Sequence, residues 1–213
     1  MLKRYARLMA VTSLICLLPT AAGLILWSRL PEQVPIHFDF AGNPDNYGSR
    51  AFAVFFIPLF ILAMQWLCLL LTRTDPKRRN VSPKVMTLML WICPLISVLV
   101  GVIMYASALG AQLDLGRIMP VLFGLLFVAI GNYLPKCRQN YTVGIKLPWT
   151  LNDEDNWNRT HRFAGYVWTI GGIVIALTGL AGISNAALLM VLLLGMVFSA
   201  GVYSYVLYRK KYG

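Results

Sequence analysis

A loop at residues 28–50 contains one of the chain's two histidines together with two nearby aspartates. Apolar and polar side chains alternate over residues 34–40, which predicts a short strand with one apolar face, and turn residues follow at 42–45. His37 and Asp39 then lie on the same side of the strand, about 6–7 Å apart, and Asp45 can return beside them after the turn.

Imidazole and carboxylate groups bind metals, so His37, Asp39 and Asp45 are candidate ligands for a metal or for a peptide. The alternative is that the same three groups only cap and order a compact loop. Three scattered ligands do not form a strong metal pattern, so the metal stays an open question and no cofactor is predicted.

A second loop, at residues 135–162, is the richest in side chains that could do chemistry. Thr150 has an acidic residue, Asp153, three positions after it, and this spacing predicts a helix from about residue 152. Trp157 and His161 are four residues apart and would share one face of that helix. Cys137 could approach His161, but the spacing requires no nucleophile–base pair, so no catalytic residue is predicted.

Two interpretations of this second loop remain open. In the first, its polar and aromatic side chains form a docking surface or polar cluster. In the second, the loop packs under a bundle of helices and anchors it to lipid headgroups, with Trp149 and Trp157 in the interfacial belt. The residues concerned are Asn140, Lys146, Trp149, Thr150, Trp157, Thr160, His161 and Arg162.

The composition around these loops fits a membrane protein. Hydrophobic residues make up 58% of the chain and charged residues 13%, whereas a soluble domain has about 25% charged residues. A water-soluble enzyme and a disulfide scaffold are therefore poor interpretations. Six apolar runs are long enough to cross a bilayer, and they are helices because a backbone in lipid must satisfy its own hydrogen bonds. The runs are residues 8–27, 51–71, 85–109, 118–134, 163–183 and 186–207.

The basic residues predict how these six runs are oriented. Sixteen of the nineteen lysines and arginines fall on one side of the membrane, and only Arg29, Arg50 and Arg117 fall on the other. The positive-inside rule then places both termini and residues 135–162 in the cytoplasm, and residues 28–50 outside. These segments are called the inner loop and the outer loop below. The net charge of +11 is read as this topology signal, so no direct nucleic-acid partner is predicted.

The interiors of the six runs contain no Asp, Glu, Lys, Arg or His, and Gln65 and Asn132 are their strongly polar residues. This disfavours pumps and proton-coupled transporters, which place ionisable groups at membrane depth. Prolines in the runs, such as Pro19, are interpreted as fixed kinks rather than hinges. Small residues predict close packing of the fifth and sixth runs. They are Gly171, Gly172, Ala176, Gly179 and Gly182 on the fifth, and Gly195, Ser199 and Gly201 on the sixth.

Two loop motifs together resemble the SdpI family, the immunity proteins against the sporulation-delay peptide toxin. Residues 30–50 (LPEQVPIHFDFAGNPDNYGSR) are similar to the two-span domain that precedes SdpI-type domains, and residues 140–165 (NYTVGIKLPWTLNDEDNWNRTHRFAG) resemble the SdpI signature itself. Arg50 and Lys146 stand where Lys and Arg are equally expected. The binding residues expected in these motifs are His37, Asp39, Asp45 and Arg50 in the outer loop, and Asn140, Gly144, Lys146, Pro148, Trp149, Thr150, Trp157, Thr160, His161 and Arg162 in the inner loop.

The resemblance implies an all-α bacterial inner-membrane protein with a two-span region at residues 1–84 and a four-span SdpI-like region at 85–213. It further implies a non-enzymatic immunity or signalling function, with a secreted peptide toxin, a cytoplasmic autorepressor and membrane lipid as expected partners. The oligomeric state stays open. The alternatives are a membrane enzyme with a polar or metal site in a loop, and a transporter of small molecules or lipids.

Overall fold

The structure, a computed structural model, describes residues 2–39, 41–183 and 185–213. Residue 40, at the end of the predicted alternation, lies outside the described residues. Six helical segments of the described chain are long and apolar enough to cross a membrane. They are Tyr5–Ile25, Phe52–Thr74, Pro83–Ala108, Leu115–Lys136, Glu154–Leu180 and Ala186–Tyr212. The predicted all-α protein with six membrane-spanning helices is thereby confirmed.

The chain forms two compact units, which divide it differently from the predicted boundary at residue 84. The first unit contains residues 1–73 and 86–114, and the second contains residues 74–85 and 115–213. Most of the third span therefore packs with the first two spans. The predicted division into regions 1–84 and 85–213 concerns family organisation and stays a prediction.

In the first unit, the first span is two helices, α1 (Leu2–Cys16) and α2 (Leu18–Ile25), which meet at Leu17. Pro19 lies in the first turn of α2, where its missing N–H costs no helical hydrogen bond. The Ser97 hydroxyl donates to the Cys16 carbonyl at 2.8 Å, and the Tyr105 hydroxyl donates to the Pro19 carbonyl at 3.0 Å. These bonds hold the carbonyls beside the break, which fits the interpretation of Pro19 as a fixed kink.

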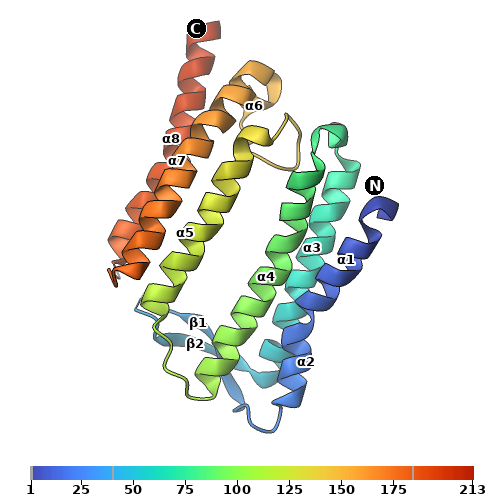
Figure 1. Ribbon diagram of the computed structural model, residues 1–213, viewed down its shortest axis with the longest axis vertical. Helices are drawn as coiled ribbons and strands as arrows, with labels where there is room; N and C mark the ends of the chain where they lie inside the picture. Colours follow the sequence, from blue (N-terminus) through green and yellow to red (C-terminus); the bar gives the residue numbers. More distant parts are fainter. Residues whose placement is uncertain (1, 40, 184) are drawn as a thin grey trace. The chain divides into compact units, whose positions relative to one another are not determined.

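The other helices of this unit are α3 (Ile57–Thr74), which follows a π-helical turn at Phe52–Phe56, and α4 (Pro83–Ala108) (Figure 1). Gln65 of α3 is buried, and its amide donates to the Thr12 hydroxyl at 2.6 Å and accepts from the Cys16 thiol at 3.0 Å. A buried amide needs such partners in an apolar surrounding. Gln65 therefore joins α3 to α1.

The outer loop forms a hairpin of β1 (Gln33–Phe38) and β2 (Pro44–Ser49), which pair antiparallel. The predicted strand is confirmed over residues 33–38. Val34 is fully buried with Leu30 in a cluster that also contains Val54 and Tyr105. The hairpin is thus fastened by its apolar face to the ends of the helices of its own unit.

The second unit contains α5 (Leu115–Tyr133), a 3₁₀ turn (Leu134–Lys136), α6 (Pro148–Asn152), α7 (Glu154–Leu180) and α8 (Ala186–Tyr212) (Figure 1). Helix α5 packs along α7 through glycines: a Cβ on Gly172 would lie 2.6 Å from the Gly124 carbonyl oxygen. The predicted close packing of the fifth span is confirmed. On the sixth span, an added Cβ at Gly195 or Gly201 meets no atom within 4 Å, so the prediction is wrong for these two glycines.

The orientation of the spans can be tested by labelling single cysteines at two exposed loop positions. Asn46→Cys in β2 is expected to react with a membrane-impermeant maleimide on intact cells, because residues 28–50 carry few basic residues. Asn152→Cys at the end of α6 is expected to react only after the membrane is permeabilised. The unmodified chain serves as the control for its native cysteines. Labelling of both positions from the same side would contradict the predicted topology.

Candidate functional site

The inner loop is organised around Asn140, a buried amide whose hydrogen-bonding groups are all used. Its Nδ2 donates to the carbonyls of Arg138 and Val143 at 2.8 and 3.0 Å. Its Oδ1 accepts from the backbone N–H groups of Thr142 and Val143 at 2.8 and 2.7 Å. A fully satisfied side chain has no group left for a ligand. Asn140 therefore shapes residues 138–143 rather than presenting a free polar group.

His161 lies in the second turn of α7 and contacts the part of the inner loop that follows residue 143. Its Nε2 accepts from the Ile145 N–H at 2.9 Å, and its Nδ1 lies 2.8 Å from the Trp157 carbonyl oxygen. Because a carbonyl can only accept, Nδ1 carries the proton and the imidazole is neutral. The Trp157 ring stacks on it with centroids 4.0 Å apart, which confirms the predicted shared face. Gly144 has a φ of +123° and crosses directly over both rings.

Trp157 is fully buried, and its indole N–H donates to the Cys137 carbonyl at 2.8 Å. The interpretation of Trp157 as an interfacial anchor is therefore wrong. Cys137 meets Trp157 through its backbone, and burial raises the pKa of its thiol to about 11. A thiol with a raised pKa is a poor nucleophile at neutral pH.

The helix predicted from about residue 152 begins at Glu154 as α7, but its capping residue differs from the prediction. The residue that caps it is Asp153, whose carboxylate accepts from the N–H groups of Asp155 and Asn156 at 3.0 and 3.3 Å. Thr150 instead lies in the separate helix α6 and accepts from the Leu147 N–H at 2.9 Å. Pro148 stands at the first position of α6, a place where proline favours the start of a helix. The capping pattern of Thr150 and Asp153 pointed to a different helix start.

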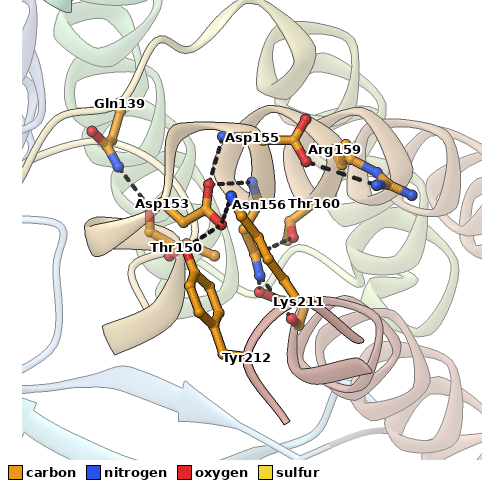
Figure 2. Close-up of polar contacts among 10 residues, drawn as sticks. Gln139, Thr150, Asp153, Asp155, Asn156, Arg159, Thr160, Lys211 and Tyr212 are labelled. Carbon is orange, nitrogen blue, oxygen red and sulfur yellow. Dashed lines mark hydrogen bonds and ion pairs between the residues drawn. The ribbon is translucent and has the colours of Figure 1, made fainter. Parts of the chain in front are cut away.

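Asn156 and Thr160 of α7, labelled in Figure 2, form a buried polar cluster with Ser204 of α8. The side-chain Oδ1 of Asn156 accepts from the hydroxyls of Thr160 and Ser204 at 3.0 and 2.7 Å, and its Nδ2 donates to the backbone carbonyl of Ser204 at 2.9 Å. Lys211, near the end of α8, donates to the Asp153 carboxylate at 2.9 Å and lowers the pKa of Asp153. Asn156 thus joins α7 to α8, and Thr160, a predicted site residue, supports Asn156 from within α7.

Asp75, directly after α3, has a buried carboxylate that contacts the inner loop. It was not among the residues predicted from the sequence. One oxygen accepts from the Tyr141 N–H and the Thr142 hydroxyl at 2.8 and 2.7 Å, and the other accepts from the Lys77 N–H at 2.7 Å. It ties the turn after α3 to residues 139–146. Because its partners lie 66 and 67 positions along the chain, spacing in the sequence gave no signal for it.

The remaining predicted residues of the inner loop stay accessible. Lys146, Pro148 and Arg162 are exposed, and Trp149 is half-buried. The Trp149 ring packs edge-on against Tyr205, with centroids 5.5 Å apart, and its indole N–H is buried with no partner among the described residues. The site therefore has a framework of Asn140, Gly144, Thr150, Trp157, Thr160 and His161, all of them buried except the half-buried Gly144. Its accessible set is Lys146, Pro148, Trp149 and Arg162.

In the outer loop, the structure brings together two of the three candidate ligands. His37 Nδ1 lies 2.5 Å from Asp45 Oδ1, and both side chains are exposed. Asp39 instead accepts from the backbone and side chain of Asn43, and these bonds lower its pKa. The described residues contain no group of three or more His, Cys, Asp or Glu side chains placed to hold a metal ion.

Arg50, the fourth candidate of the outer loop, fastens the base of the hairpin. Its guanidinium donates to the Trp27 carbonyl at 2.7 Å and to the Pro31 carbonyl at 3.3 Å, and it lies over the Trp27 ring. These contacts join the two ends of the outer loop, so Arg50 stabilises the base of the hairpin.

Comparisons with known proteins match stretches that contain both loop motifs. Residues 136–206 match the SdpI/YfhL protein family, and residues 14–62 match a domain of unknown function, DUF1648. Immunity protein SdpI of Bacillus subtilis (strain 168) is 28% identical over 210 residues, which cover 95% of this chain and 97% of the relative. No solved structure matches. The resemblance expected from the loop motifs is confirmed.

Proposed function

We propose, from the premise that residues 136–206 are SdpI-like, that this multi-pass membrane protein is an immunity protein against a secreted toxic peptide. The observation that carries the proposal is the similarity to Immunity protein SdpI over 95% of the chain, which includes both loops. The cell membrane of a bacterium is the proposed location.

A binding role is supported by the way the inner loop uses its reactive groups. Both nitrogens of His161 are occupied by backbone partners, and the Cys137 thiol has a raised pKa. These groups hold the loop in shape, which suits a surface that recognises a partner rather than one that transforms a substrate.

Two surfaces have separate tasks in this proposal. The exposed side of the outer hairpin, with His37 and Asp45, is accessible to a peptide from outside. The accessible set of the inner loop, with Lys146, Trp149 and Arg162, offers two cations and an aromatic ring. We place an intracellular partner there, such as an autorepressor, because the neighbouring buried residues keep this surface rigid.

The test is survival of Bacillus subtilis cells that lack their own SdpI and are exposed to sporulation-delay peptide. Cells that express this chain are expected to survive better than cells with an empty vector. Trp149→Ala is expected to reduce that protection while the amount of protein in the membrane stays unchanged. The substitution removes an accessible aromatic side chain and leaves the residues of the framework around His161 in place. Tyr166→Ala, at an exposed position of α7, is the matched control and is expected to protect fully.

Equal killing of expressing and empty-vector cells, with the protein present in the membrane, would refute immunity against this peptide. Protection by the unmodified chain together with full protection by Trp149→Ala would retain immunity and refute the role of the inner surface.

A further inference from the structure

A polar pocket of about 540 Å³ opens beside the turn that connects α3 to α4. This volume is in the usual range for small-ligand sites. The pocket is separate from the His161 framework and is lined by one continuous stretch and two further residues. The lining is Pro76, Lys77, Arg78, Arg79, Asn80, Gln139 and Glu154.

The backbone around the pocket is held in place by the buried residues that surround it. Asp75 accepts from the Lys77 N–H, and the Arg78 N–H donates to the Asp75 carbonyl at 3.0 Å. Asn80 donates from its side chain to the Gln139 carbonyl at 2.7 Å. The turn that carries Lys77, Arg78 and Arg79 is thus held at both ends in the absence of a ligand. This reduces the entropy lost on binding.

The charges of the lining select one class of ligand. Lys77, Arg78 and Arg79 supply three positive groups, and Glu154 supplies one negative group. Arginine matches the oxygen geometry of phosphate with paired N–H donors. Three positive groups and one negative group leave the lining a net charge of +2, which matches a phosphate monoester or diester better than a polyphosphate.

We propose that this pocket binds a phosphate ester at Lys77, Arg78 and Arg79. The turn follows one membrane-spanning helix and precedes the next, so lipid headgroups lie within its reach. A phosphodiester lipid such as phosphatidylglycerol is one source of the group, and a soluble phosphate ester is the other.

The experiment measures lipid retention by the purified full-length protein with native mass spectrometry. The probes are phosphatidylglycerol, diacylglycerol without a phosphate, and soluble glycerol 3-phosphate as competitor. The unmodified protein is expected to retain phosphatidylglycerol in preference to diacylglycerol. The double variant Arg78→Gln/Arg79→Gln is expected to bind it about tenfold or more weakly, since each basic side chain near a lipid headgroup contributes about fivefold.

The matched control is Arg209→Gln/Lys210→Gln, which removes two exposed charges from the end of α8. It is expected to keep the affinity of the unmodified protein, and Arg78→Lys/Arg79→Lys is expected to recover part of it. Competition by glycerol 3-phosphate at equal concentration would support the phosphate site and identify a soluble ligand. Equal weakening in the pocket variant and the control, or equal retention of diacylglycerol, would overturn the proposal.

Discussion

Gly144→Ala is expected to abolish protection and to destabilise the fold by about 2–4 kcal/mol. The backbone at Gly144 has a φ of +123°, a conformation that side chains other than glycine rarely adopt. An added Cβ would also collide with His161 Nε2 and lie 2.8 Å from the Trp157 ring. Because Nε2 receives the Ile145 N–H, the collision would break the bond that joins the loop to α7. Thermal unfolding followed by tryptophan fluorescence measures the loss.

The matched control is Gly195→Ala in α8, where an added Cβ meets no atom within 4 Å. It is expected to leave the unfolding temperature unchanged or to raise it slightly, because alanine favours a helix more than glycine does. If Gly144→Ala were as stable as Gly195→Ala, the described arrangement of the loop over His161 would be wrong.

Asp75→Ala is expected to release the inner loop at a cost of about 2–4 kcal/mol, because buried donors without partners are destabilising. The substitution removes the acceptor of the Tyr141 N–H, the Thr142 hydroxyl and the Lys77 N–H. Residues 138–146 would then open more often. Limited proteolysis with trypsin is expected to cut after Arg138 or Lys146 faster than in the unmodified protein.

Asp155→Ala is the control for a lost carboxylate in the same region. Asp155 is exposed and pairs with Arg159 at 3.7 Å (Figure 2). Exposed pairs of this kind contribute at most about 0.5 kcal/mol, so its cleavage rate is expected to stay near that of the unmodified protein. Equal cleavage of Asp75→Ala and Asp155→Ala would show that Asp75 does not hold the loop.

Hydropathy was sufficient to predict the six spans, because the need to satisfy backbone hydrogen bonds in lipid leaves few alternatives. The beginning of α7 carries no such signal, since residues 154–162 are polar, and its start near residue 152 was predicted from the capping pattern instead. Because Asp153 caps α7, the helix of the fifth span begins at residue 154, nine residues before the apolar run that starts at residue 163. Asp153 could have been predicted as the cap, because aspartate is favoured at that position, but Thr150 is also of a type favoured there.

The inner loop shows where sequence reasoning ends. Trp157 and His161 could be paired from helical periodicity, because their contact is local. The bond from Ile145 to His161 spans 16 positions, and those from Tyr141 and Thr142 to Asp75 span more than 60. Such contacts depend on how separate helices end and turn, which no local pattern encodes. Gly195 and Gly201 of α8 failed as a packing signal for the same reason, since a glycine in a helix does not specify its partner.

The Gln65 contact also affects how the protein is made. During synthesis the helix that contains Thr12 and Cys16 leaves the translocation channel before α3 does. A lone Gln65 carboxamide would then face acyl chains, which cannot hydrogen-bond to it. Binding to Thr12 and Cys16 removes that cost. The first two spans are therefore more stable in the bilayer as a pair than singly, so their pairing favours the insertion of α3.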